Sequence, residues 1–243
     1  MSGLSLWPIG NCQVSALVDG KGSFVWGCTP RVDGDPLFCS LLDPVENGGG
    51  PRGEWSVELE NQVSAEQRYL RNTPVLVTRL SDSEGGIADV FDFCPRFQRS
   101  GRMYRPIAFV RIVRPIAGTP RVRFTLNPAV NFGAREAERT SGTNHIRYLV
   151  KSQPLRLTTD APVSHILDSR FFRLEKSLHF FLGPDEPFVG NVAHTLAAML
   201  HQTVEDWRSW VRGLAIPLEW QKVVIRAAIT LKLCQHEETG AIV

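Results

Sequence analysis

The chain has 243 residues, of which 43% are hydrophobic and 21% are charged, and its formal net charge is +2. This composition is typical of a globular protein, and the length suits one large β domain or one domain with part of another. Because the charges are mixed and form no basic block, there is no electrostatic reason to expect nucleic-acid or membrane binding.

Short segments rich in Val, Ile, Phe and Leu run from the N-terminus to about residue 183, separated by Gly, Pro, Asn and Asp. This pattern is typical of strands and turns. Because no helical segments lie between them, a parallel βαβ fold is not expected. Strands are expected at residues 13–18, 23–28, 55–60, 64–70, 75–80, 87–93, 107–113, 121–127, 145–150, 154–159 and 171–182.

Two local patterns indicate antiparallel pairing. Asp19-Gly20 followed by Lys21-Gly22 predicts a tight hairpin between the first two strands, because Gly permits positive φ. In residues 121–127 every second residue is apolar, which predicts a strand with one dry face and one wet face. Many antiparallel strands in one region predict a large β-sandwich. Residues 46–53 are expected to form a flexible loop.

After Pro184 the apolar residues recur at the spacing of an α-helix. One apolar stripe predicts a helix over residues 189–213, which Gly213 can end. The stripe consists of Val192, Leu196, Leu200, Thr203, Trp207, Trp210 and Leu214. A second helix is expected over residues 218–235, with Pro217 suited to its first turn.

This second helix is apolar on most sides, so it should belong inside a larger structure. Gly240 is interpreted as a helix stop signal, after which Ala-Ile-Val begins another element. We therefore expect that the chain ends where a second domain begins.

Residues 9–43, IGNCQVSALVDGKGSFVWGCTPRVDGDPLFCSLLD, resemble the opening of prokaryotic family 15 glycoside hydrolases, the glucoamylase and trehalase-like group. The resemblance continues in order along nearly the whole chain, and the ordered set is more specific than any one motif. The further segments are RYLRNTPVLVTRL (68–80), DVFDFCP (89–95), FVRIVRPIAG (109–118), LNPAVNFG (126–133), EDWRSWV (205–211) and VIRAAITLKLCQHEETGAIV (224–243).

This resemblance implies a mainly β fold followed by helices. Residues 1–185 would form an antiparallel β-super-sandwich, 186–214 a helical linker, and 215–243 the first helix and turn of a truncated (α/α)6 barrel. In such enzymes the barrel hydrolyses α-linked glucosides with inversion, using one carboxylic acid and one carboxylate. The resemblance places both groups beyond Val243, so no catalytic residue, cofactor or metal is expected here, and the chain by itself should be inactive.

The loop TPRVDGDPLF (29–38) carries the substrate-loop candidates Arg31, Asp33 and Asp35. The loop could reach toward the barrel mouth and help to shape the sugar site. Alternatively, it is an ordinary turn in which an Arg–Asp pair holds the hairpin. Its likeness to the family's PRFDSPSVF is interrupted at Gly34. Asp33 and Asp35 are too close in sequence to act as an inverting pair, whose carboxyl groups stand roughly 6.5–9.5 Å apart on opposite sides of the bond.

The tryptophans Trp207, Trp210 and Trp220 lie at helical spacing beside Leu and Val. Such residues could stack on sugars, but this pattern favours packing in a core or between domains. Trp26 and Trp55 lie within expected strands and are assigned to the core or to a sheet face.

Four other residues could be mistaken for active-site groups. Asp89 and Asp92 should fall on opposite faces of a strand, one solvated and the other hydrogen-bonded near a turn. His194 and His201 should share one face of the first helix, where they lack the i, i+4 spacing of metal-binding pairs. Neither pair is expected to be catalytic or to bind a metal.

The five cysteines, an odd number without a CxxC motif, are expected to be small buried hydrophobic residues; they are Cys12, Cys28, Cys39, Cys94 and Cys234. The N-terminus has no basic region, and no apolar run reaches about 18 residues, so neither a signal peptide nor a membrane span is expected. A cytoplasmic location fits best.

Three functional hypotheses follow. The first is the non-catalytic N-terminal part of a family 15 enzyme that acts on trehalose, malto-oligosaccharides or another α-glucoside. The second is a free-standing carbohydrate-binding or interaction module. The third is one half of a split enzyme whose barrel is a separate chain. The missing barrel, in cis or in trans, is the expected partner, and an α-glucoside is the expected ligand of the complete enzyme.

Overall fold

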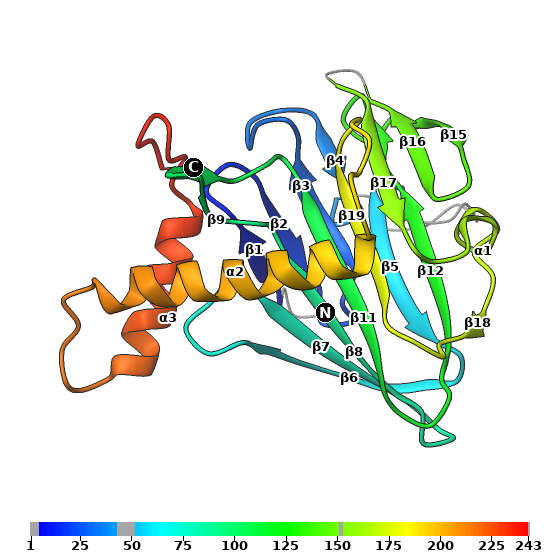
Figure 1. Cartoon of the computed structure of the whole chain (residues 1–243), viewed down its shortest axis with the longest axis horizontal. Coiled ribbons are helices and arrows are strands. Elements are labelled where there is room, and N and C mark those ends of the chain that lie inside the picture. Colours follow the sequence, from blue (N-terminus) through cyan, green and yellow to red (C-terminus); the bar gives the residue numbers. More distant parts are fainter. Residues whose placement is uncertain (1–4, 43–51, 151–152, 243) are drawn as a thin grey trace.

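Two large antiparallel sheets lie face to face in the computed structural model, which describes residues 5–42, 52–150 and 153–242 (Figure 1). The expected antiparallel sandwich is therefore confirmed. The expected loop at residues 46–53 lies mostly outside the described residues.

The first sheet has seven strands in the order β1-β2-β3-β5-β12-β18, with β4 paired to β3. Its strands are β1 (Trp7–Gly10), β2 (Ser15–Val18), β3 (Phe24–Cys28), β4 (Pro36–Phe38), β5 (Glu54–Leu59), β12 (Arg121–Asn127) and β18 (Phe172–Arg173).

The second sheet has eight strands in the order β15-β16-β17-β19-β11-β8-β7-β6. They are β6 (Gln62–Tyr69), β7 (Leu76–Asp82), β8 (Ile87–Phe93), β11 (Phe109–Ala117), β15 (Glu138–Ser141), β16 (His145–Leu149), β17 (Leu155–Thr159) and β19 (Leu178–Pro184). Two small ribbons complete the β structure, β9 (Phe97–Arg99) with β10 (Arg102–Tyr104), and β13 (Ala129–Val130) with β14 (Arg135–Glu136).

Aromatic rings from both sheets fill the space between them. Phe24 of β3 lies 5.2 Å from Trp55 of β5 and 5.9 Å from Phe109 of β11, measured between ring centroids. Phe124 of β12 and Phe180 of β19 are 4.5 Å apart. Such pairs contribute roughly 0.5–1.5 kcal/mol each beyond the burial of their surface, so they help to fix the two sheets against each other.

The arginine of a buried ion pair within the second sheet also bonds to the opposite layer. Arg111 of β11 and Asp92 of β8 are both fully buried, with Nε and Oδ1 2.7 Å apart. The Arg111 guanidinium also donates to the carbonyl oxygens of Trp55 in the first sheet and of Gly22 in the β2–β3 turn, at 3.0 and 2.6 Å. The β2–β3 hairpin that holds Gly22 forms as expected, with Gly22 at a φ of 90°.

Asp89 is buried on the other side of β8 and pairs with Arg79 of β7 at 2.7 and 2.9 Å. The expectation that either Asp89 or Asp92 is solvated, with the other near a turn, is therefore wrong. Both carboxylates lie within the strand and are neutralised by arginines on neighbouring strands, because a buried carboxylate needs a paired charge.

Helix α2 (Val192–Arg212) covers the outer face of the second sheet (Figure 1). Its apolar side, including Leu196, Leu200 and Val204, packs against Val110 and Ile112 of β11. This cover explains why β11 is buried on both faces over its first five residues. The Asn191 side chain caps the helix start by accepting from the His194 N–H, and Gly213 caps its end, as expected.

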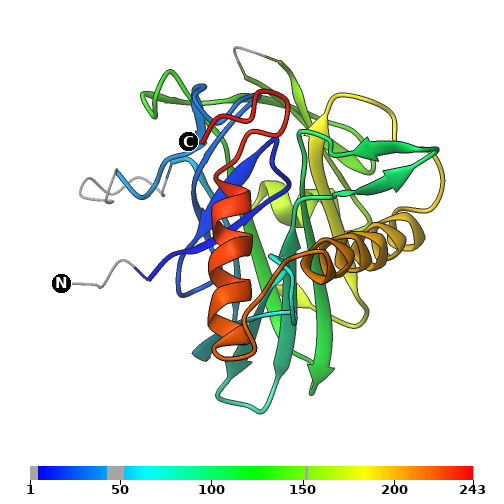
Figure 2. The same cartoon turned by 90° about the vertical axis from the view of Figure 1, so that its left-hand side faces the viewer.

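Helix α3 (Gln221–Leu233) lies alongside the β1–β2 hairpin (Figure 2). It is shorter than expected and starts after Trp220, which has a left-handed φ of 63°, so Pro217 is not in its first turn. One short helix, α1 (Val163–Leu167), was not anticipated. The expected strand at 171–182 is divided into β18 and β19.

The expected domain division at residues 1–185, 186–214 and 215–243 stays a prediction. Strands end at Pro184, and α2 and α3 follow. Among the described residues, no helix is both long and apolar enough to cross a membrane. Cys12, Cys28, Cys39 and Cys94 are buried, and Cys234 is half-buried.

Candidate functional site

The loop between β3 and β4 carries the three predicted substrate-loop residues. Arg31 donates to both carboxylate oxygens of Asp33, at 2.9 and 2.7 Å, and both side chains are largely exposed. This hydrogen bond holds the pKa of Asp33 below its ordinary value. The two residues therefore form the Arg–Asp pair of the alternative interpretation, and their approach to a substrate stays a prediction.

Asp35 contacts a different segment. Its carboxylate accepts from the backbone N–H groups of Asn131 and Phe132, at 2.7 and 2.6 Å. Both residues have left-handed φ values, 55° and 56°, between β13 and β14. The loop thus brings Arg31 and Asp33 together but directs Asp35 to the 131–132 turn, and a contact of Asp35 with substrate also stays a prediction.

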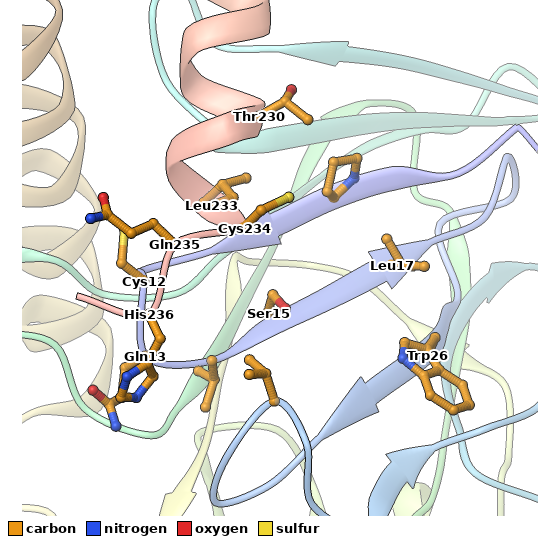
Figure 3. Close-up of a pocket in the computed structure, with 13 residues that line it drawn as sticks. Cys12, Gln13, Ser15, Leu17, Trp26, Thr230, Leu233, Cys234, Gln235 and His236 are labelled. Atoms are coloured by element: carbon orange, nitrogen blue, oxygen red, sulfur yellow. The ribbon is translucent and has the colours of Figure 1, made fainter. Parts of the chain in front are cut away.

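A pocket of about 180 Å³ lies beside this loop (Figure 3). It is enclosed by the β1–β2 hairpin, Trp26 of β3, Val32 of the loop and the C-terminal end of α3. The described residues that line it include thiols, amides, hydroxyls and an imidazole, and none of them is Lys, Arg, Asp or Glu. The pocket can therefore offer hydrogen bonds and apolar contact to a neutral molecule.

The segment after α3 folds back on itself next to this pocket. Gln235 forms an antiparallel bridge with Ile242, and the His236 N–H donates to the Ala241 carbonyl at 2.8 Å. Gly240, with a φ of 73°, occupies the turn between them. The interpretation of Gly240 as a helix stop is wrong, because α3 already ends at Leu233 with Cys234 as its cap.

An ionic cluster holds that segment against the sandwich. Arg96 follows β8, has a side chain only 5% exposed, and contacts both Asp206 of α2 and Glu237. Glu237 also lies 3.4 Å from Arg105 and 3.5 Å from Lys232. Burial raises the pKa of Asp206, and Arg96 opposes this effect. We call these five residues the Arg96 cluster, and it joins α2, α3 and the sandwich at one point.

The three predicted packing tryptophans have different surroundings. Trp207 is fully buried against Ile229 and Leu233 of α3, and Trp210 meets it edge-on with ring centroids 5.6 Å apart. Trp220 is 76% exposed. The assignment of these residues to packing between domains stays a prediction, and for Trp220 the partner would have to lie outside the described residues.

Trp220 stands just before α3, at the start of an apolar stripe along the uncovered side of that helix. Val223 and Leu231 are 65% and 66% exposed, and Ala227 between them is also exposed. Val223, Ala227 and Leu231 are each four residues apart, which places them on one face of the helix, opposite Ile229 and Leu233. The helix is apolar on most sides, as expected, but only one of its apolar faces is covered and the other is exposed to solvent.

The two histidines His194 and His201 are exposed on α2. No group of three or more potential metal-ligating side chains occurs among residues 5–42, 52–150 and 153–242.

Sequence reasoning missed Arg96, Asp206, Glu237 and Gln13. Arg96 meets Asp206 and Glu237 across 110 and 141 residues of sequence, and no local pattern marks such a contact. The sequence pattern assigns Gln13 only to the start of a strand, whereas the structure buries its Oε1 without a hydrogen-bond partner among the described residues.

The sequence matches the family described as "Trehalase-like, N-terminal" over residues 4–172. The trehalase of Thermoplasma volcanium is 23% identical over 97% of this chain and 38% of its own length. The trehalase of Mycolicibacterium smegmatis is 26% identical over 96% of this chain and 38% of its own. That of Mycobacterium tuberculosis is 25% identical over 95% and 37%. The chain therefore spans less than two-fifths of the length of these relatives. No solved structure matches it.

Proposed function

We propose that this chain, which belongs to the family of trehalase-like N-terminal domains, is the non-catalytic N-terminal part of a trehalase-like enzyme. In this proposal the catalytic residues belong to the part of the enzyme that lies outside the chain. The chemistry would be that of family 15 glycoside hydrolases, inverting hydrolysis of an α-glucoside, and trehalose is the first substrate to test. A cytoplasmic location stays a prediction.

The uncovered apolar stripe on α3 carries the proposal. Trp220, Val223 and Leu231 are each at least 65% exposed. Removing one such side chain from water contributes about 1.5–3 kcal/mol, so the stripe is a strong site for packing against further protein. The relatives named trehalase are more than twice as long as this chain, and the additional chain is the proposed cover.

The Arg96 cluster supports the same role. It holds the segment after α3 through Glu237, and it holds α2 through Asp206. The Glu237 N–H also donates to the Cys12 carbonyl at 3.1 Å, which adds a backbone contact to the β1–β2 turn. The sandwich would thus set the direction of α3 and present its uncovered face to the catalytic domain.

The test is an assay for glucose release by the purified chain with trehalose and with maltose. We expect no release, because the proposal assigns no catalytic pair to these residues. The trehalase of Thermoplasma volcanium, assayed with trehalose under the same conditions, is the positive control. Glucose release that copurifies with the 27.1 kDa chain would contradict the proposal.

In the hypothesis of a split enzyme, the protein that packs on the uncovered stripe of α3 is a separate chain instead of a continuation of this one. A helical partner that copurifies with the chain, and whose binding is abolished by Val223→Glu with Leu231→Glu, would favour assembly in trans. A longer endogenous protein that contains this sequence would favour a single chain.

A further inference from the structure

A second pocket, of about 470 Å³, lies where the first half of α3 faces the turn between β6 and β7. The strand end and turn contribute Tyr69 and Arg71, and the helix contributes Lys222 and Arg226. The two elements are joined by a hydrogen bond of 3.1 Å from the Arg226 Nη1 to the Thr73 carbonyl oxygen. Three basic side chains from two separate elements thus meet around one opening.

The positive charge of this lining is not neutralised. Arg71 and Lys222 are exposed, and Arg226 is half-buried. No Asp or Glu occurs among the described residues that line the pocket. Glu219, which precedes the helix, does not line it either. The pocket therefore offers three cations to an anion that enters from solvent.

Arg226 has the strongest need for a negative partner. Its guanidinium carbon lies 4.0 Å from the ring centroid of Tyr69. Burial lowers the pKa of Arg226, with Tyr69 opposing. A partly buried cation without an acidic partner is costly, and an anionic ligand would remove that cost. The Nε atom is inaccessible and Nη1 is already bonded, so Nη2 is the donor that a ligand would meet.

The beginning of α3 adds to this potential. The helix has no side-chain cap and no acidic residue in its first turn, which includes Gln221 and Lys222 of the pocket lining. The positive end of the helix dipole is therefore uncompensated at the same place. This effect supports the site, but the three basic side chains define it.

We propose that this pocket binds a phosphate group, either as inorganic phosphate or as part of a small molecule. Near pH 7 a phosphate group carries about −1.5 to −2 charges on several acceptor oxygens, so it matches three cations better than a carboxylate with one charge does. Arg71 and Lys222 would bind it from opposite sides of the opening, and Arg226 would donate from Nη2.

The volume also allows a larger ligand. It is about three times the roughly 150 Å³ cavity that encloses benzene in another protein, so an organic group attached to the phosphate would fit. Ile225 and Tyr69 would contact that group. The inference does not rest on the proposed function, because it requires neither a catalytic domain nor a sugar substrate.

The test is the thermal unfolding of the full 243-residue chain at pH 7.5 in rising concentrations of inorganic phosphate, compared with sodium chloride at equal ionic strength. We expect a saturable rise in the unfolding temperature with phosphate only, because a ligand that binds the folded state stabilises it. Hydrogen exchange measured by mass spectrometry should slow at residues 69–73 and 221–226.

Arg71→Gln combined with Lys222→Gln should weaken phosphate binding at least tenfold, because each charge-assisted hydrogen bond corresponds to a tenfold change or more. Arg173→Gln combined with Lys176→Gln is the matched control. It removes the same two charges at exposed positions near β18, on the opposite side of the molecule from α3 (Figure 1), and should leave binding unchanged.

Glycerol 3-phosphate distinguishes the two sources of the phosphate group. Tighter binding of this ester than of inorganic phosphate would identify a phosphorylated small molecule as the ligand, and weaker binding would identify the free ion.

Four results would overturn the inference. They are a rise in unfolding temperature no larger than that in chloride, slower exchange that lies away from the pocket, equal weakening by the control pair, and an equal response to acetate. The last result would assign the pocket to a carboxylate, such as an acidic side chain of a neighbouring protein domain.

Discussion

The carboxylate of Asp35 accepts a hydrogen bond of 2.6 Å from the backbone N–H of Phe132, which lies 97 positions further along the chain. Phe132 has a φ of 56°, a value that is rare for a bulky residue. Phe132 is 79% exposed, so packing of its side chain does not hold the backbone in this conformation. Asp35 therefore stabilises a strained turn next to the loop that was predicted to approach substrate.

Replacing Asp35 by Ala should destabilise the fold by about 1–3 kcal/mol, because two backbone N–H groups lose a charged acceptor. The measurement is the urea unfolding midpoint. Asp33→Ala is the matched control in the same loop and should change the midpoint little, because Asp33 is exposed and its ion-pair partner Arg31 is exposed too. Equal shifts for the two variants would show that Asp35 does not hold the turn.

The burial of the tyrosines predicts that the protein loses stability at alkaline pH. Burial raises the pKa of Tyr69 to about 12, with Arg226 opposing, and burial also raises the pKa values of Tyr104 and Tyr148. The folded protein thus keeps phenolic protons that the unfolded chain releases near its ordinary pKa of about 10. The stability contributed by neutral Tyr69 is fully present below about pH 10 and is lost as the pH rises toward 12.

We expect the tyrosinate absorbance of the native protein to rise at a clearly higher pH than that of the same protein in urea. All three tyrosines of the chain contribute, so the signal has no background from exposed phenols. Coincident titration curves in the two conditions would contradict the burial of these side chains.

Within the Arg96 cluster, replacing Arg96 should reduce the stability of the fold the most. Arg96→Met removes the partner of Asp206 and one partner of Glu237. Breaking a buried pair in this way costs about 3–5 kcal/mol. We expect faster amide hydrogen exchange in α3 and in residues 235–242, measured by mass spectrometry.

Arg99→Met is the control for that substitution. Arg99 is exposed on β9, and its guanidinium lies 5.7 Å from the ring centroid of Tyr104. Hydrogen exchange in α3 should not change in this variant. If Arg96→Met leaves α3 as protected as Arg99→Met does, the cluster does not secure the helix.

Features that depend on residues close together in the sequence were predicted best. Strand β12 has the expected bounds, because its apolar residues alternate and its burial pattern follows them from Arg121 to Asn127. The span 171–182 was misjudged because its polar centre interrupts the pairing, and the Leu174 N–H there donates to Pro120 instead of continuing a strand. The start of α3 was missed because Pro217 is a common first-turn residue, whereas the helix begins only after the left-handed Trp220.

The candidate site was less accessible from sequence. The Arg31–Asp33 pair is local and was foreseen as an alternative. The pocket is not local, because it combines Gln13 and Trp26 with Gln235 from the far end of the chain. The Asp92–Arg111 pair was missed for a similar reason, since their contact depends on the register between β8 and β11. Residue type alone could not show which of the acidic residues would be buried.

The uncovered stripe on α3 predicts self-association of the purified chain. Val223→Glu combined with Leu231→Glu places two charges on that face and should shift the protein toward the monomer in light scattering. Val189→Glu together with Leu149→Glu is the control, because these apolar residues are exposed away from α3. Deleting α3 would be a poorer test, since Ile229 and Leu233 cover the buried Trp207.

The same double substitution distinguishes an accidental patch from a domain interface. In a complete enzyme, charges on a face that packs against the catalytic domain should lower the thermal unfolding temperature and the activity together, because two buried charges would lack partners. An accidental patch would remain in water, so only self-association of the isolated chain would change. Unchanged activity and unfolding temperature in the complete enzyme would therefore remove α3 from the interface, even if the isolated chain became monomeric.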